Sequence, residues 1–402
     1  MRKIDLNNFQ VATSETARDI NSRIMLNLVR KHQPISRADL MRHSGLQRST
    51  VSVITEQLIA ERWLREGEVG QLPRGRRPTF LHLNEDRAGI FGINVRPFTT
   101  NMVLANLEGR FLEQESMVTP SSPDEFVKQI AERIQSFMKE RPQMAYEGIG
   151  VSLPGRVDLS SQKFIFAPNL KWHEEDLKER LERATGLPVD LENEANACAL
   201  SEFWFGRHSD SVSNLIAVAV SEGIGVGMIL NGQIVRGPSG LAGEFGHVSI
   251  NENGPKCGCG NRGCWEVFAS NSAGVRYYTE AKLSKRNGKN HHDKTNVSFE
   301  DVLQLAEQGD LQALDALDRM AHYLGRGISM LVTGLAPDVI VVVGEVTRAW
   351  DRIGPIITDV VKQRSFTHPT TRIIASGPAP QPRLRGIIAL VLQKHFSAPT
   401  IA

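Results

Sequence analysis

Three of the four cysteines lie within eight residues, as Cys257, Cys259 and Cys264 in CGCGNRGC, and His247 precedes Cys257 by ten residues. Three thiolates and one imidazole complete the tetrahedral shell of a structural Zn²⁺ and leave no position for a catalytic water. A redox or disulfide cluster is the alternative, but soft thiolates select zinc where a compartment keeps cysteines reduced. The spacing therefore predicts a zinc-binding loop over residues 247–264.

Two carboxylates flank this predicted loop. Glu244 lies three residues before His247, and Glu266 lies two residues after Cys264. A loop made rigid by a metal ion holds such side chains in fixed positions, as a binding site requires. We therefore expect a ligand-binding site beside the metal.

Composition limits the class of protein. The chain has 402 residues, enough for two or three domains, and 41% hydrophobic with 23% charged residues is ordinary for a soluble globular protein. The N-terminus MRKIDLNNFQ has no apolar stretch typical of a signal peptide, and no apolar run approaches the roughly 18 residues of a membrane span. These features predict a cytoplasmic protein.

Charge is unevenly distributed along the chain. Residues 1–82 contain 14 Lys and Arg against 8 Asp and Glu, whereas the whole chain has a net charge of only +2. A basic N-terminal segment on an acidic remainder favours a polyanionic partner, although many basic domains are merely soluble.

The basic segment has the pattern of a helix-turn-helix. A first helix is expected over 19–32, where apolar residues recur at helical spacing, and Pro34 ends it. Ser36 is expected to cap a short second helix that runs to His43, and Gly45 supplies the turn. A third helix is expected over 47–60. The predicted inward-facing residues are Ile20, Ile24, Met25, Leu28 and Val29 in the first helix, and Val51, Ile54, Leu58 and Ile59 in the third.

The start of the third helix and a following hairpin carry polar and basic side chains. Short strands at 63–66 and 78–83 flank GQLPRGRRP, so an arginine-rich wing is expected. Such side chains suit base edges and phosphates, so the segment predicts DNA binding; a solvated helix face is the alternative for the helix alone. The candidate DNA-binding residues are Gln47, Arg48, Ser49, Thr50 and Ser52 in the helix and Arg74, Arg76 and Arg77 in the wing.

The remainder alternates strand and helix patterns and predicts an α/β body with parallel and antiparallel strand pairs. The expected strands are 89–95, 100–105, 148–153, 214–220, 225–230 and 339–343, and the expected helices are 124–140 and 313–335. Residues 282–295 are basic and polar and are expected to form an exposed loop.

Motifs in the body resemble those of the ROK family (repressors, open reading frames and sugar kinases). GEFGH at 243–247 matches GExGH, CGCGNRGCWE at 257–266 matches CxCGxxGCxE, and VSLPGRVD, APNLKW and ENEANACA are similar to family segments over about residues 85–395. The resemblance implies a body of two actin-like lobes with a sugar cleft over residues 83–402, preceded by a winged helix-turn-helix over 1–82. With that added head, the chain is most similar to the xylose-type repressors of the family.

The resemblance also implies which side chains contact sugar. Asn193, Glu244, His247 and Glu266 match sugar-contacting positions, and Glu194 takes the place of the family's catalytic Asp. Carboxylates and amides are suitable partners for sugar hydroxyls, although Glu244 and Glu266 could instead support the metal loop. Cys198 is expected to pack in the core rather than bind metal.

Departures from the kinase pattern argue against catalysis. The longer Glu194 side chain displaces the base, and base geometry is demanding. The segments that bind phosphate in the kinases are also altered here. The kinase motif DxGxT is replaced by Asn94-Val95-Arg96-Pro97-Phe98, GTG by Ser221-Glu222-Gly223, and the late Gly-Gly pair by Gly344-Glu345. Glu222 is expected to face a triphosphate and repel it. These segments predict a sugar sensor that is not an enzyme.

The sequence thus predicts a DNA-binding repressor of sugar-utilisation genes, with its operator affinity controlled by a sugar. A homodimer, or a higher oligomer, is expected because helix-turn-helix dimers bind pseudo-palindromic operators. Two alternatives remain open: a sugar kinase with a DNA-binding head, and a repressor controlled by a partner protein.

Overall fold

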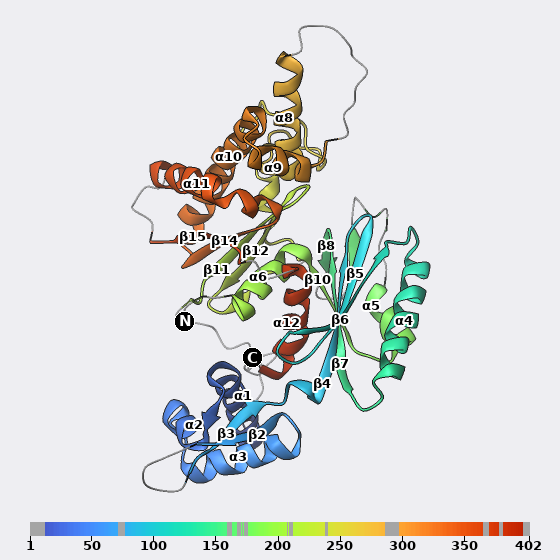
Figure 1. Ribbon diagram of the computed structural model, residues 1–402, viewed down its shortest axis with the longest axis vertical. Coiled ribbons are helices and arrows are strands. Elements are labelled where there is room, and N and C mark those ends of the chain that lie inside the picture. Colours follow the sequence, from blue (N-terminus) through green and yellow to red (C-terminus); the bar gives the residue numbers. More distant parts are fainter. Residues whose placement is uncertain are drawn as a thin grey trace.

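The computed structural model shows a small N-terminal head joined to a body of two α/β lobes (Figure 1). It describes residues 13–396 except 71–76, 159–162, 167–169, 171, 173–175, 207, 209–211, 238–239, 286–296, 365–369 and 378–380. Among the helices it describes, none has the length and apolar character needed to cross a membrane.

The head contains helices α1 (Ser14–His32), α2 (Arg37–Ser44) and α3 (Arg48–Ala60) and a sheet in the order β1-β3-β2. Its strands are β1 (Ile35–Ser36), β2 (Leu64–Val69) and β3 (Thr79–Leu83). Ser36 and Asp39 form a reciprocal capping box at the start of α2, and Gly45 ends α2 with a φ of 70°. These local signals explain why the second and third helices lie where the sequence predicts them.

Two predictions about the first helix need correction. It begins at Ser14 rather than Asp19, because Thr13 and Thr16 form a capping box that the sequence reading overlooked. Ile24, predicted to face inward, is 41% exposed. The buried residues of α1 are Met25, Leu26 and Val29, because the core meets a narrower face of the helix than the apolar pattern implies.

The first lobe is a five-stranded sheet in the order β10-β7-β4-β5-β6. Strands β4 to β6 form an antiparallel meander, and β7 and β10 continue the sheet in parallel with β4. Helices α4 and α5 pack together against one face of the sheet, whereas α12 packs against β4 and β7. The elements are β4 (Ala88–Val95), β5 (Thr99–Ala105), β6 (Phe111–Val118), α4 (Pro123–Glu140), β7 (Ala145–Leu153), α5 (Leu177–Thr185), β10 (Val189–Asn193) and α12 (Pro382–Phe396). A separate hairpin of β8 (Arg156–Asp158) and β9 (Lys163–Phe166) follows β7.

The second lobe repeats this plan with a sheet in the order β13-β12-β11-β14-β15. Helices α8 to α11 form the layer far from the first lobe, and α6 packs against β11 and β12 (Figure 1). The strands are β11 (Leu215–Val220), β12 (Ile224–Leu230), β13 (Gln233–Ile234), β14 (Val339–Val343) and β15 (Arg372–Ala375). The helices are α6 (Glu194–Phe205), α7 (Glu266–Ala269), α8 (Asn271–Lys285), α9 (Phe299–Glu307), α10 (Leu311–Leu335) and α11 (Trp350–Arg364), with short turns η2 (Glu244–His247) and η3 (Glu345–Ala349).

The predicted fold, a winged helix-turn-helix followed by a two-lobed α/β body, is confirmed. One local expectation was wrong: residues 282–285 belong to α8, not to an exposed loop. The rest of that segment, residues 286–295, lies outside the described residues.

Helices α6 and α12 meet between the two lobes. A Cβ added to Gly386 of α12 would lie 1.7 Å from the carbonyl oxygen of Ala197 in α6. Only glycine permits so close an approach of the two backbones. The lobes are therefore joined by direct contact between their two inner helices.

Candidate functional site

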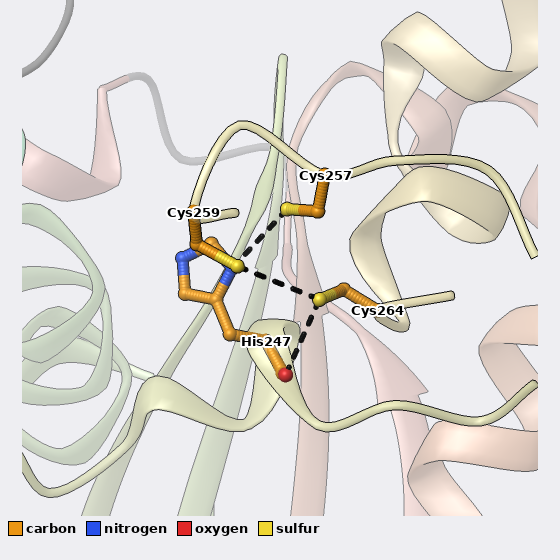
Figure 2. Close-up of side chains that lie close together, drawn as sticks. All are labelled: His247, Cys257, Cys259 and Cys264. Carbon is orange, nitrogen blue, oxygen red and sulfur yellow. Dashed lines mark hydrogen bonds between the residues drawn. The ribbon is translucent and has the colours of Figure 1, made fainter. Parts of the chain in front are cut away.

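The predicted metal ligands converge in the second lobe. One ligand atom from each of His247, Cys257, Cys259 and Cys264 lies within 4.8 Å of all the others. The Sγ atoms of Cys259 and Cys264 are 3.7 Å apart, and Cys257 Sγ is 3.6 Å from His247 Nδ1. A tetrahedral Zn²⁺ with bonds of about 2.0–2.3 Å separates its ligands by roughly 3.3–3.8 Å. All four cysteines of the chain are free, and the cluster can hold a metal ion (Figure 2).

The loop that carries these ligands is anchored to the lobe. The residue after Cys264 is Trp265, which is fully buried and donates its indole N–H to the carbonyl of Tyr323 in α10 at 2.8 Å. A Cβ on Gly327 of α10 would come within 1.8 Å of the Trp265 ring. The glycine thus makes room for the indole, and the ring fixes the end of the loop against α10.

Two carboxylates border the cluster on either side of the imidazole. Glu266 Oε1 accepts from Cys257 Sγ at 2.9 Å and lies 3.5 Å from His247 Nδ1. Glu244 Oε2 lies 3.8 Å from the other ring nitrogen of His247. Burial, together with the nearby Glu266 carboxylate, raises the pKa of the Cys257 thiol. In the absence of metal the cluster therefore retains a proton that a bound cation would displace.

Asn193 and Glu194 lie at the junction of β10 and α6. Asn193 caps α6 by accepting from the N–H of Ala195 at 2.8 Å, and its amide donates to the carbonyl of Gly155 at 2.7 Å. Glu194 Oε2 accepts from Arg383 Nε at 2.8 Å. Both side chains thus have structural partners that the sequence reading did not identify.

The two groups of candidate residues border the same strand, β12. A Cβ on Gly227 of β12 would lie 2.2 Å from the carbonyl oxygen of Ala195, next to Glu194. Glu244 lies between Gly243 and Gly246, and both glycines approach β12 closely. A Cβ added to Gly243 would lie 2.2 Å from a β12 carbonyl oxygen, and one added to Gly246 would lie 2.1 Å from another. The β10–α6 junction and the metal loop therefore both pack closely against β12.

A buried ion pair that sequence reasoning missed connects these groups. Glu192 is 1% exposed, and its Oε2 accepts from Arg236 Nε at 2.8 Å. Its Oε1 accepts from the amide of Asn196 at 2.9 Å. The carbonyl of Arg236 accepts from the N–H of Ala242 at 2.9 Å. This hydrogen bond fixes Ala242, two residues before Glu244, relative to Arg236. Glu192 directly precedes the Asn193-Glu194 pair, but nothing in the sequence indicates a partner 44 residues away.

The altered phosphate segments contact each other directly. Arg96, in the segment after β4, lies with its Nη2 3.1 Å from Glu222 Oε1, in the turn between β11 and β12. The carboxylate of Glu222, which the sequence predicts to face and repel a triphosphate, is paired with Arg96. Asn94 Oδ1 and Ser152 Oγ, on neighbouring strands of the first lobe, are buried without a hydrogen-bond partner among the described residues.

The candidate DNA-binding side chains lie at the start of α3 and in the hairpin. Gln47 is the N-cap residue of α3, and Gln47, Arg48 and Ser49 are exposed, whereas Thr50 and Ser52 are half-buried. Strands β2 and β3 form the expected antiparallel hairpin. Arg77, in the connection that leads into β3, is exposed. Arg74 and Arg76 lie outside the described residues.

Comparison with known proteins settles the family. The ROK family model matches residues 91–394. The chain belongs to the ROK family. It is 36% identical over 334 residues to the xylose repressor of Bacillus subtilis, covering 82% of this chain and 83% of that protein.

Solved structures of the family are similar over most of the chain. A ROK family transcriptional regulator, homologous to the Escherichia coli Mlc protein, matches with a TM-score of 0.80 and 26% identity over 95% of this chain and 98% of that one. A ROK glucokinase from Streptomyces griseus, in complex with glucose and AMPPNP, matches with a TM-score of 0.64 and 28% identity over 75% of this chain and 99% of that one. The regulator thus matches over the head and the body together, whereas the kinase matches over a smaller part of the chain.

Proposed function

We propose that this ROK protein is a DNA-binding transcriptional repressor whose operator affinity is controlled by a sugar bound between the two lobes. The observation that carries this proposal is the presence, in one chain, of a winged helix-turn-helix and a ROK body with paired rather than open phosphate segments. The xylose repressor of B. subtilis and the Mlc homologue are both named as regulators, which supports the same function here.

We assign DNA binding to residues 1–82, with the sugar-binding body over 83–402. The exposed Gln47, Arg48 and Ser49 at the N-terminus of α3 are suited to a major groove, with Thr50 and Ser52 beside them. The wing arginines Arg74, Arg76 and Arg77 would neutralise phosphates or enter a minor groove. Two heads on a homodimer would match the half-sites of a pseudo-palindromic operator.

We assign sugar binding to Asn193, Glu194, Glu244, His247 and Glu266. The β10–α6 junction and the metal loop both pack against β12, which supports a shared site. Their carboxylates and imidazole provide hydrogen-bond partners for several sugar hydroxyl groups. The cluster of His247, Cys257, Cys259 and Cys264 would hold a structural Zn²⁺, since its soft, closed donor set fits that ion. With His247 Nδ1 toward the ion, the other ring nitrogen would hold the neighbouring Glu244 in place.

Catalysis of phosphoryl transfer is not expected. The Arg96–Glu222 ion pair places a carboxylate where an anionic phosphate chain would have to approach. Glu194, in the position of the family's base, has its Oε2 in an ion pair with Arg383 at 2.8 Å, so that oxygen already accepts from a charged donor. Both contacts favour a sensor over a kinase.

A titration of operator DNA with the full-length protein tests the function. Fluorescence anisotropy with operator DNA should show tight binding that weakens when D-xylose or another sugar from a panel of pentoses and hexoses is added. Unchanged operator affinity with every sugar, or sugar-dependent ADP release in a coupled assay, would contradict the proposal.

A further inference from the structure

Helix α12 makes contact with both the candidate sugar site and the head. It has 15 residues, from Pro382 to Phe396, so it spans about 22 Å. Arg383 lies at its first turn beside Glu194, and Phe396 lies at its last turn in the hydrophobic cluster that joins the head to the first lobe. In Figure 1, α12 runs between the first-lobe sheet and α6, with its C-terminal end directed to α1.

At the cleft end, the contact is a largely buried ion pair. The Arg383 side chain is 13% exposed, and its Nε donates to Glu194 Oε2 at 2.8 Å. Burial alone would lower the pKa of Arg383. The negative charge of Glu194 has the opposite and larger effect, so the pKa of Arg383 lies above its usual value. The guanidinium therefore stays charged, and any ligand that draws Glu194 away must leave Arg383 without its partner.

Contact between α12 and α6 prevents the pair from adjusting in isolation. Gly386, one turn after Arg383, lies against the carbonyl of Ala197, one turn after Glu194. Packed helices move as rigid elements with few alternative arrangements. A shift of the α6 N-terminus toward a ligand would therefore displace α12 as a whole.

At the head end, α1 holds the last turn of α12 through side chains that donate to its carbonyls. Asn27 Nδ2 donates to the carbonyl of Phe396 at 2.6 Å, and Arg23 Nη1 donates to that of Lys394 at 3.0 Å. The ring of Phe396 meets the edge of Trp63 at a centroid distance of 6.4 Å. The position of α1, and with it of α3, is thus tied to that of α12.

We propose that α12 transmits occupancy of the cleft to the head, with the Glu194–Arg383 pair as its input and the Asn27–Phe396 contact as its output. The inference rests on the proposed function and adds the path by which sugar changes operator affinity. A sugar hydroxyl that binds Glu194 competes with Arg383, and the resulting shift of α12 moves α1 relative to the body. A ligand acts in this way because its affinity differs between the two arrangements.

The head also meets the body outside α12: Arg30 of α1 lies over the Trp204 ring of α6 at 4.7 Å, and the residues between β3 and β4 make further contacts. Arg87 lies over the Trp63 ring at 3.8 Å and pairs with Glu147, which also contacts His395 at 2.8 Å. These contacts lie at the beginning of β4 and β7, whereas Asn193 and Glu194 lie where β10 ends, and Glu244, His247 and Glu266 lie beyond β13. The β3–β4 connection therefore anchors the head without direct contact to the cleft.

Variants at both ends of α12 test the inference in the full-length protein. Asn27→Ala removes the output contact and touches no candidate sugar residue. The double variant Glu194→Gln with Arg383→Gln removes both charges, so neither is left buried and unpaired. Arg352→Gln is the matched control, because it breaks an Arg–carboxylate pair of 2.7 Å between α11 and α10, away from α12.

The measured quantity is the ratio of operator Kd with and without sugar, using D-xylose and D-glucose as probes, with sugar Kd measured separately by calorimetry. Asn27→Ala should bind sugar as the wild type does, yet its ratio should fall at least fivefold toward 1, within the usual range of coupling between sites. The double variant should have a ratio near 1 even at saturating sugar, and Arg352→Gln should keep the wild-type ratio.

The outcomes separate the two proposals. A wild-type ratio well above 1 that Asn27→Ala and the double variant both retain would overturn the role of α12 and leave the repressor function intact. A wild-type ratio of 1 with every sugar would contradict the repressor function and the role of α12 together. Thermal unfolding of each variant establishes that it is folded before its ratio is compared.

Discussion

Arg96 and Glu222 form an ion pair of 3.1 Å between the two segments that correspond to the phosphate loops of the family's kinases. The first segment belongs to the β4–β5 turn of one lobe and the second to the β11–β12 turn of the other. The pair therefore links the two lobes directly.

Arg96→Ala should leave the chain folded and without kinase activity. Glu222 is 70% exposed, so the pair contributes less than about 1 kcal/mol to the free energy of unfolding. A coupled ADP-release assay should detect no turnover of ATP by either the wild type or the variant. Turnover by the wild type that Glu194→Gln abolishes would instead establish the kinase.

The metal prediction has a control within the chain. The wild type should contain about one Zn²⁺ per chain by elemental analysis, and Cys264→Ser should lose the ion and the response to sugar. Cys198→Ala should retain it, because Cys198 is buried in α6 outside the cluster. A folded wild type with less than about a tenth of an equivalent of metal would show that the cluster is not a metal site.

Glu244→Gln should produce a repressor that sugar does not release. The substitution keeps the shape of the side chain but removes the charged acceptor, so sugar affinity should fall by roughly 10- to 100-fold. Operator affinity without sugar should be unchanged, because Glu244 lies in the second lobe. Glu252→Gln, an exposed carboxylate in the same loop, serves as the control. Wild-type sugar affinity in the Glu244 variant, measured by calorimetry, would remove this residue from the site.

Arg48→Ala and Arg77→Ala should affect operator binding differently. Loss of a base contact by Arg48 should cost about 1–3 kcal/mol and relax the preference at one operator position. Loss of a phosphate contact by Arg77 should weaken binding to all sequences alike and lower the salt slope by about 1. Arg372→Ala, an exposed site in the second lobe, is the control. Titrations in which neither head variant differs from this control would refute the placement of the DNA-binding surface.

Arg236→Ala should be strongly destabilising. It leaves the carboxylate of Glu192, which is 1% exposed, without its ionic partner. Removal of one member of a buried pair costs about 3–5 kcal/mol, so the midpoint of urea unfolding should fall substantially. Combining it with Glu192→Gln should recover part of the loss. A single variant as stable as the wild type would mean that water reaches Glu192 in solution.

Local signals in the sequence predict the parts of the structure that depend on neighbouring residues. Ser36 and Asp39 set the start of α2, and the spacing of Cys257, Cys259 and Cys264 is sufficient to predict that they converge. The contacts that decide how the site is held are not local. Glu194 and Arg383 are 189 residues apart, and nothing near either one indicates the other. The exposure of Ile24 also depends on which face of α1 meets the core, which the apolar pattern alone does not specify.

The packing of Phe396 against Trp63 has a consequence for biosynthesis. The head is translated first, but Phe396 follows Asn27 by 369 residues. The head lacks two contacts until then, one from Asn27 to the Phe396 carbonyl and one from Trp63 to the Phe396 ring. At about 5–20 residues per second, roughly 20–75 seconds pass before the ribosome supplies that helix. A nascent head therefore waits with part of its apolar surface uncovered, and it acquires its final contacts only when the entire sensor has been made. Chains that stop before α12 would therefore carry a head without these last contacts.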